Sequence, residues 1–303
     1  MRWPARIGRW DVKHLLGSGG VAEVLLGVDP TTGDEAALKR CVAERADDPV
    51  QAAALRLEAR LLTRLHHPNV VGLVELIDGP APAIALERLS GCMLSTALGA
   101  ETQNATPDRF EPLDVGIAIE VAAQAAAALV AVHSAVDESL RALEAVHRDV
   151  SPDNLFLTVD GTVKLFDFNV SFLRGHTEAP APGALQGRVA YMAPEQARGE
   201  HVTGHADVFS LGVVLWEAVV GERLFWRGTT MATLHALLHE PVRRSTERRA
   251  VISRALDDLI ASALHPDPLQ RPSALELERH LRALEPTDRA LRERLASLAA
   301  QRP

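Results

Sequence analysis

The sequence predicts an α+β protein in which a small lobe of antiparallel strands precedes a larger, mainly helical lobe. Short alternating runs broken by turn signals fill residues 10–42, whereas long Ala- and Leu-rich segments with helical spacing dominate from Leu113 onward. The strand-like stretch 154–168 is the exception in the second part. We therefore expect one domain over 10–284, with a small lobe at 10–89 and a large lobe at 90–284, followed by a charged helical tail at 285–303.

The elements of the small lobe are set by its turn signals. The runs "WDVKHLL", "VAEVLLGV" and "EAALKRCV" are separated by "GSGG" and "DPTTGD", which predicts a meander of antiparallel strands. A helix is predicted from about residue 49 to residue 65, and two more strands within 70–89. At the other end of the chain, Leu291, Leu295 and Leu298 stand among charges, which is typical of a surface helix.

Composition excludes several classes of protein. A net charge of −8 over 303 residues argues against a broad nucleic-acid surface, which needs basic side chains to neutralise phosphates. Cys41 and Cys92 each stand alone, so a disulfide framework or zinc site is not expected, and a reducing compartment fits. No signal-peptide-like run opens the sequence, and the most apolar segment, 208–221, is shorter than the roughly 20 residues of a membrane span. We expect a cytoplasmic protein without membrane insertion.

A short hairpin in the second part carries two polar residues at its open end. Asp160 and Gly161 form a strong two-residue turn signal between "NLFLTV" and "TVKLFDF". Pairing outward from that turn places Asn154 opposite Asp167. An amide oxygen beside a carboxylate suits Mg²⁺ that keeps its waters and meets a phosphate. The alternative is a polar pair that closes the end of the hairpin.

The loop "VHRDVSPDN", residues 146–154, precedes this hairpin. Asp149 lies five residues before Asn154, between a helix and a strand, where catalytic groups are often found. Near a metal-bound phosphate, its carboxylate would accept a proton from an attacking hydroxyl or orient that hydroxyl. A solvated Asp–Arg pair is the alternative.

The glycine-rich run "LGSGGVAEV", residues 16–24, lies between two strands. Walker and dinucleotide-binding loops need a helix after the glycines, so both are excluded. A flexible hairpin lid over phosphates and a plain tight turn both remain.

Lys39 and Glu58 are predicted to form an ion pair. Lys39 alternates with Ala37 and Cys41 on the inward face of a strand, and Glu58 lies within the apolar stripe of the following helix. A buried carboxylate without a partner costs several kcal/mol, roughly, so Lys39 is its natural partner. The pair is either purely structural or part of a site.

Together these motifs resemble the protein kinases, and "YMAPEQ" at 191–196 is similar to the bacterial serine/threonine (Hanks-type) members. The resemblance runs from about Trp10 to about Leu284 and implies the bilobal protein-kinase fold, ATP and Mg²⁺ as cofactors, and a protein substrate. It implies catalytic roles for Lys39, Glu58 and Asp149, and metal binding by Asn154 and Asp167. The residues that it assigns to nucleotide binding are Leu16, Gly17, Gly19, Val24, Ala37, Lys39, Glu87, Leu89 and Phe156.

The resemblance also implies supporting contacts. Glu195 is expected to pair with Arg271, Asp207 to brace the catalytic loop (residues 147–154), and Leu86 to be the gatekeeper beside the hinge. The connection between His133 and His147 is longer than is usual in the family. We interpret it as an inert extension of the preceding helix; a docking surface is the alternative.

Four positions depart from the family pattern. Asn169 stands where the glycine of the DFG motif is usual, and Ala22 replaces the third glycine of the lid. Ser151 occupies the place of the lysine that serine/threonine kinases carry, whereas Arg188 brings a cation in place of a threonine. We hypothesise that Arg188 is catalytic and replaces the missing lysine; a solvated loop residue is the alternative. Thr177 is the one well-placed acceptor for phosphorylation in the activation loop, residues 167–195, where Arg148 would bind the phosphate; weak or absent phosphorylation of this loop is the alternative.

The predicted function is ATP-dependent phosphorylation of serine or threonine hydroxyls of proteins in intracellular signalling. The alternative is a pseudokinase that binds nucleotide or acts as a scaffold, because Asn169, Ser151 and Arg188 depart from the pattern. A kinase of small molecules is a more distant option, since the "APE" segment belongs to kinases of proteins. A regulatory protein partner is a possible source of the upstream signal.

Overall fold

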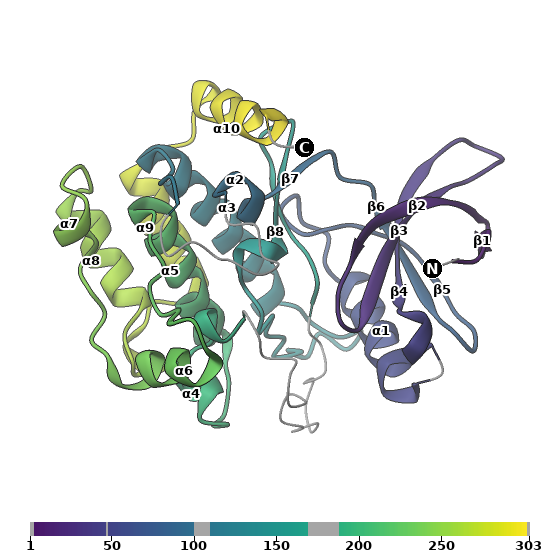
Figure 1. Cartoon of the computed structure of the whole chain (residues 1–303), viewed down its shortest axis with the longest axis horizontal. Helices are drawn as coiled ribbons and strands as arrows, with labels where there is room; N and C mark the ends of the chain where they lie inside the picture. Colours follow the sequence, from purple (N-terminus) through teal and green to yellow (C-terminus); the bar gives the residue numbers. More distant parts are fainter. Residues whose placement is uncertain (1–2, 47, 100–109, 169–187, 302–303) are drawn as a thin grey trace. The chain divides into compact units, whose positions relative to one another are not determined.

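The computed structural model describes residues 3–46, 48–99, 110–168 and 188–301, which belong to two compact units whose boundary in the sequence falls between Leu89 and Ser90 (Figure 1). The first unit is built on an antiparallel sheet and the second is mainly helical. The predicted α+β class, with a strand-rich lobe before a helical lobe, is confirmed.

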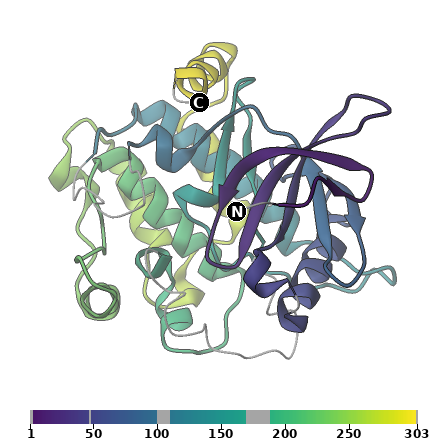
Figure 2. The same ribbon diagram turned by 45° about the vertical axis from the view of Figure 1, so that its right-hand side comes forward.

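The first unit contains a six-stranded sheet and one long helix. Its strands are β1 (Arg6–Ile7), β2 (Trp10–Ser18), β3 (Ala22–Val28), β4 (Glu35–Cys41), β5 (Leu73–Ile77) and β6 (Ala83–Glu87), in the order β1-β2-β3-β4-β6-β5 with every pair antiparallel. Figure 2 shows the long, curved hairpin of β2 and β3. The predicted meander is present, and β1 is an addition too short for a sequence pattern to reveal.

Strand alternation gives the sheet its two faces. Ala36 and Leu38 of β4 are fully buried in a cluster with Trp10, Leu25 and Ala85. Ala37 and Lys39 alternate with them and point to the opposite face. One strand therefore supplies both the core of the unit and the residues of the candidate site.

Helix α1 (Pro49–Leu62) packs against β4, β5 and β6, after the short 3₁₀ turn η1 (Ala43–Arg45). Asp48 caps its N-terminus by accepting a hydrogen bond from the backbone N–H of Val50, and proline occupies the first helical position. The helix stops at Leu62, three residues before the predicted end, where Thr63 closes the last turn.

The second unit is mainly helical. Its helices are α2 (Leu94–Ala97), α3 (Val115–His133), α4 (Pro194–Ala197), α5 (Gly204–Val220), α6 (Thr230–His239), α7 (Ser245–Arg248), α8 (Arg254–Ala263), α9 (Ala274–Leu284) and α10 (Arg289–Gln301), with 3₁₀ turns η2 (Pro152–Asn154), η3 (Arg188–Tyr191) and η4 (Pro268–Gln270). Helix α5, which contains most of the apolar segment 208–221, is buried along nearly its whole length. Helix α3 packs on both α5 and α9.

Helix α3 is a second strongly apolar helix, which the sequence prediction did not single out. By length and composition alone it would suffice to cross a membrane, with a mean hydropathy of 2.0 over an 18-residue window. However, 72% of that window is buried inside the protein. Its apolar surface is therefore that of a core helix packed against α5, α9 and β9.

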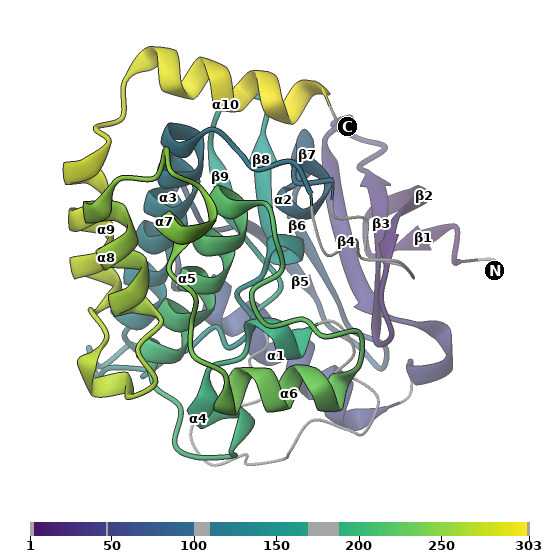
Figure 3. The ribbon, with the colours of Figure 1, turned by 60° about the vertical axis from the view of Figure 1, so that its left-hand side comes forward.

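A small second sheet contains the predicted hairpin of this unit. It consists of β7 (Gly91–Met93), β8 (Leu155–Thr158) and β9 (Val163–Leu165), in that order, and β7 was not predicted. Helix α10 extends across β7, β8 and α3 (Figure 3). Its buried residues are Leu291, Leu295 and Ala299, so the third position of the predicted stripe shifts by one residue from Leu298.

The long connection after α3 is a tight loop, and the preferred prediction of a helix extension is wrong. Helix α3 ends at His133, and Val136 bridges to Ala142 in antiparallel fashion. The Asp137 carboxylate accepts hydrogen bonds from the backbone N–H groups of Ser139 and Arg141. Such side-chain bonds offer the backbone an alternative to the helix.

Candidate active site

The ion pair of the first unit joins β4 to α1. Lys39 Nζ lies 2.7 Å from Glu58 Oε1 and 2.6 Å from Oε2, and both side chains are buried. The predicted pairing is confirmed. Because two charges are removed from water, neither residue tolerates loss of the other without leaving an uncompensated buried charge.

Several residues predicted to bind nucleotide share the face of the sheet that carries Lys39. Strand pairing places Gly17 beside Val24 and Val24 beside Lys39. Ala37 pairs with Leu86, one step from Glu87 at the end of β6. Leu16, Val24 and Ala37 are all half-buried, so this line of small and apolar side chains retains accessible surface.

The glycines of the lid are not required by packing within the unit. A Cβ atom added at Gly17 would meet nothing within 4 Å, and one at Gly19 would meet only the Ala22 carbonyl oxygen at 3.6 Å. Neither glycine has a positive φ. Ala22 begins β3 and pairs with Cys41, so its backbone is extended and an alanine replaces the usual glycine there without strain. Because local packing does not require glycine at these positions, the close approach of a ligand is the reason that is left for them.

The predicted hinge segment, residues 87–89, is hydrogen-bonded to Gly72, the residue before β5. The Glu87 backbone N–H donates to the Gly72 carbonyl at 2.9 Å, and the Gly72 N–H donates to Glu87 Oε1 at 2.7 Å. These reciprocal bonds fix the backbone of Glu87 at the end of β6. Leu89 follows as a half-buried residue, and Leu86 is buried on β6.

In the second unit, the catalytic loop holds Asp149 and Asn154 against each other. The Asn154 amide nitrogen donates to the Asp149 carbonyl at 2.7 Å and to Asp149 Oδ2 at 2.9 Å. Both bonds use the amide NH₂ group, which orients the Asn154 Oδ1 atom as the one suited to a cation. Asp149 and Asn154 are buried, at 9% and 2% exposure.

The hairpin after this loop has a register one residue away from the predicted one. Leu155 pairs with Leu165 and the Phe166 N–H donates to the Asn154 carbonyl, so Asn154 stands opposite Phe166 and not opposite Asp167. The prediction assumed a two-residue turn. A three-residue loop, 159–161, is present instead, with Gly161 at φ +81°.

Asp167 lies one residue beyond the hairpin pairing and has an unusual backbone conformation. Its φ is +61°, in the left-handed region that Asp tolerates better than most residues with a Cβ. Asn154 and Asp167 therefore both lie at the open end of the hairpin, as predicted, although they do not face each other. Phe156, predicted to contact adenine, is half-buried on β8.

Asp207 of α5 accepts hydrogen bonds from the backbone of the catalytic loop. Its Oδ2 accepts from the His147 backbone N–H and from His133 Nε2, both at 2.8 Å, and its Oδ1 accepts from the Arg148 N–H at 2.7 Å. Arg148 has a φ of +67°. Burial opposes ionisation of Asp207, but these hydrogen bonds and the neighbouring histidines hold its pKa below the usual value. The predicted bracing contact is present, and His133 is an addition.

The segment after the activation loop is held by two buried ion pairs. Arg271 Nη1 and Nη2 contact Glu195 Oε1 at 2.7 Å and Oε2 at 2.8 Å, so the expected pair is formed. A second cluster was missed: Tyr191 Oη donates to Glu217 Oε2 at 2.8 Å, and Arg223 Nη1 contacts the same carboxylate at 2.9 Å. Burial raises the pKa of both Tyr191 and Glu217.

The departures from the family pattern are only partly described. Ser151 is 1% exposed, and its hydroxyl has no hydrogen-bond partner within the described residues. Arg188 begins η3, but its side chain lies outside the described part of the chain, as do Asn169 and Thr177. The structure therefore brings together Asp149, Asn154 and Asp207, while the Arg188 hypothesis stays a prediction.

The donor chemistry fits Mg²⁺ and a phosphate. Asn154 and Asp167 supply hard oxygen ligands, which is the usual protein share for Mg²⁺ that keeps its waters and a phosphate. Within the described residues no group of three or more His, Cys, Asp or Glu gathers as a metal site. The two-ligand set is thus suited to a metal that arrives with a nucleotide.

Comparison with known proteins gives one consistent result. The family described as "Protein kinase domain" matches residues 10–281. The chain is 35% identical to tyrosine-protein kinase MasK of Myxococcus xanthus over 87% of this chain and 41% of that protein. It is 30% identical to serine/threonine-protein kinase PknB of Mycobacterium leprae (87% and 40%) and 31% identical to serine/threonine-protein kinase PksC of Streptomyces coelicolor (88% and 47%). The chain spans less than half the length of these relatives.

Proposed function

The chain belongs to the protein kinase family, with the bacterial Hanks-type serine/threonine kinases, and we propose that it transfers the γ-phosphoryl group of MgATP to serine or threonine hydroxyls of a protein substrate. One observation carries the proposal most directly. Lys39 and Glu58 are already paired at 2.6–2.7 Å, and this pair must be in place for a protein kinase to act on ATP.

The remaining residues take roles consistent with their geometry. Lys39, held by Glu58, would bind the α- and β-phosphates, and Asp149 would orient the substrate hydroxyl and accept its proton. Asn154 and Asp167 would hold Mg²⁺, whose chemistry when bound is to neutralise charge on the phosphate oxygens. Gly17, Gly19, Val24 and Ala37 would cover the nucleotide.

The class of hydroxyl is the finer part of the proposal. Ser151 replaces a lysine that is usual in serine/threonine kinases, and one relative carries the name tyrosine-protein kinase. The two other relatives named above are serine/threonine kinases, which favours Ser and Thr. Nothing in the described residues favours the pseudokinase alternative, because Lys39, Glu58, Asp149, Asn154 and Asp167 are all retained.

The test is phosphotransfer by the purified chain with MgATP and a basic acceptor protein, followed by intact-mass measurement and phosphoamino-acid analysis. We expect phosphoserine and phosphothreonine with the wild type and no label with Asp149→Asn. Phosphotyrosine alone would refute the serine/threonine assignment. No label at all, with ATP still raising the melting temperature, would refute the transferase and support a nucleotide-binding pseudokinase.

We further propose that Arg188 supplies the cation that Ser151 lacks. The sequence positions of the two residues support this, since one neighbour of the reaction loses a cation while the other gains one. Arg188→Ala is expected to lower phosphotransfer at least tenfold, roughly the effect of one charge-assisted contact to the transferred group. Arg198→Ala, at an exposed arginine after α4, is the matched control. Activity within a few fold of wild type would refute the role.

We propose the cytoplasm as the site of action. Cys41 is a buried free thiol, which is the state expected in a reducing compartment. Fractionation of cells that express the chain, with detection in the soluble cytoplasmic fraction, tests this. Co-purification from the same fraction would identify a regulatory protein partner.

A further inference from the structure

Two polar residues interrupt the most apolar helix of the second unit. Glu120 and Gln124 lie one turn apart on α3, at 1% and 6% exposure. Burying an amide and a carboxylate in such a helix costs free energy unless both are hydrogen-bonded. Their contacts therefore indicate what the helix gains from them.

Gln124 is bonded to the loop of the β8–β9 hairpin. Its Nε2 donates to the Gly161 carbonyl at 3.1 Å and to Glu120 Oε1 at 2.8 Å, while its Oε1 accepts from the Val163 N–H at 2.8 Å. An amide rotated by 180° would place oxygen against oxygen and N–H against N–H. One side chain thus fixes the backbone on both sides of Thr162.

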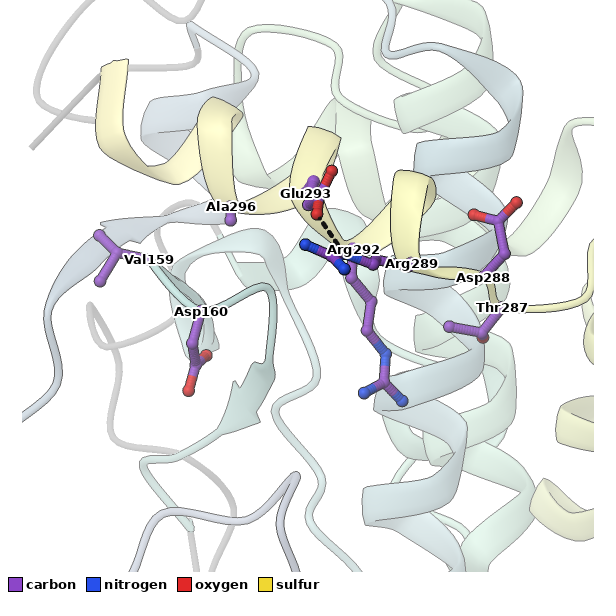
Figure 4. A pocket seen from close by; sticks show the side chains of 8 residues that line it. All are labelled: Val159, Asp160, Thr287, Asp288, Arg289, Arg292, Glu293 and Ala296. Carbon is purple, nitrogen blue, oxygen red and sulfur yellow. Dashed lines mark hydrogen bonds and ion pairs between the residues drawn. The ribbon is translucent and has the colours of Figure 1, made fainter.

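Glu120 extends this contact to the chain after α9. Its Oε2 accepts from Arg282 Nη1 at 2.6 Å and from Thr287 Oγ1 at 2.5 Å. Helix α10 then passes directly over the loop: a Cβ atom at Gly161 would lie 2.6 Å from the Arg292 carbonyl oxygen. In Figure 4, Val159 and Asp160 of the loop lie beneath α10, with Arg292 extending down beside them.

The loop and the predicted metal ligands are opposite ends of one short hairpin. Only the four residues of β8 and the three of β9 separate them, a span of roughly 10–14 Å. A rotation or slip of so short a ribbon at its loop is transmitted to Asn154 and Asp167, because a one-residue slip reverses every side chain.

We propose that Gln124 is a positioning residue for the metal-binding end of this hairpin, and that Glu120 couples the same hairpin to Thr287 and α10. The inference rests on the proposed function, since it assigns Asn154 and Asp167 to the metal. It makes the segment after α9, beyond the part of the chain that matches the kinase family, a support of the active site.

The test measures Mn²⁺ binding by electron paramagnetic resonance to protein loaded with the non-hydrolysable ATP analogue AMP-PNP, so no turnover is needed. We expect Gln124→Met, which keeps the size but loses the hydrogen bonds, to raise the Mn²⁺ dissociation constant about threefold or more. Thr287→Val, nearly equal in shape, should move it in the same direction by less. Leu277→Ala, at a buried residue of α9, is the control for lost stability.

The outcomes separate this inference from the proposed function. A raised Mn²⁺ dissociation constant in Gln124→Met with a wild-type value in Leu277→Ala supports the positioning role. Equal values in wild type and Gln124→Met, or equal rises in Gln124→Met and Leu277→Ala, overturn it. Absence of nucleotide-dependent Mn²⁺ binding in the wild type also overturns it. Phosphotransfer by the wild type, measured separately, decides the proposed function in each case.

Discussion

At the scale of single residues, Asp207 determines the backbone of the catalytic loop. Its carboxylate accepts three hydrogen bonds, two of them from consecutive backbone N–H groups around the strained Arg148. Backbone in the left-handed region persists only where its surroundings over-determine it. Asp207 therefore maintains a conformation that Arg148 would not adopt alone.

The pH dependence of this contact has a definite sign. The pKa of Asp207 in the folded protein lies below 3.8, so the unfolded chain binds more protons in acid. The stabilisation is fully present above about pH 4 and is lost as pH falls through the folded pKa. We predict that Asp207→Asn lowers the free energy of unfolding at pH 7 by about 3 kcal/mol and flattens its fall in acid. Thermal unfolding between pH 3 and pH 7, roughly, measures both; parallel profiles would contradict the assignment.

Tyr191 contributes one hydroxyl to a buried ion pair. Tyr191→Phe leaves Glu217 and Arg223 in contact but removes a donor from a carboxylate that is fully buried. We predict a loss of about 1.5–3 kcal/mol in the free energy of unfolding, the usual contribution of one hydrogen bond to a charged group. Denaturant unfolding at pH 7 measures the change. A variant as stable as the wild type would show that the hydroxyl contributes nothing net.

The same residues show which contacts sequence reasoning finds. The sequence predicts the ion pair of Glu58 and Lys39, because a carboxylate within the apolar stripe of a helix needs a partner. Glu217 stands in an equally apolar run, "VVLWEAVV", and Glu120 in another, so the same reasoning would have flagged both as buried carboxylates. Their partners were not readable, because Tyr191 and Arg282 lie 26 and 162 residues away in the sequence.

At the scale of elements, the β8–β9 hairpin illustrates what a turn signal leaves open. The strands and their turn were predicted, yet the register was wrong by one residue. Asp160-Gly161 is compatible with a two-residue loop and with a three-residue loop that ends on a left-handed glycine. Here the backbone N–H of Thr162 donates to both the Asp160 carboxylate and the Thr158 hydroxyl. These two hydrogen bonds favour the three-residue loop.

Gly161 combines a conformational and a packing requirement, and the chain offers a control that separates them. Gly33 has the same φ of +81°, but a Cβ there would meet nothing within 4 Å. We predict that Gly33→Ala costs about 1 kcal/mol of unfolding free energy through strain. Gly161→Ala should cost about 1–3 kcal/mol more, because α10 must move away. Equal losses of unfolding free energy in the two variants, measured by denaturant unfolding, would show that α10 moves away from Gly161 at no cost in stability.

At the scale of the whole molecule, the order of lobes and the family were predictable because they depend on periodicity and on motif order along the chain. The extra strands β1 and β7 were not, since two and three residues give no period to detect. The loop after α3 was also mispredicted, because side-chain bonds from Asp137 decide it. Roles that depend on 169–187 lie outside the described residues.

The net charge of −8 leads to a prediction about substrates. A negative protein attracts basic segments, and this attraction weakens as salt shortens the screening length. We predict that kcat/KM for a basic peptide falls severalfold between roughly 0.05 and 0.3 M salt, while that for a neutral peptide changes little. Steady-state kinetics on the two peptides tests this. Equal salt dependence of kcat/KM for the two peptides would show that the negative charge of the protein does not act on the bound substrate.

The three-residue loop of the β8–β9 hairpin also constrains how this protein can evolve. Surface loops usually accept insertions and deletions, but removal of one residue here would set Asn154 opposite a different residue of the second strand. The loss would be felt at Asp167, at the far end of the hairpin. Viable descendants are therefore expected to inherit the length of this loop even where its residues change, or to restore it by an equal change between Leu165 and Asp167.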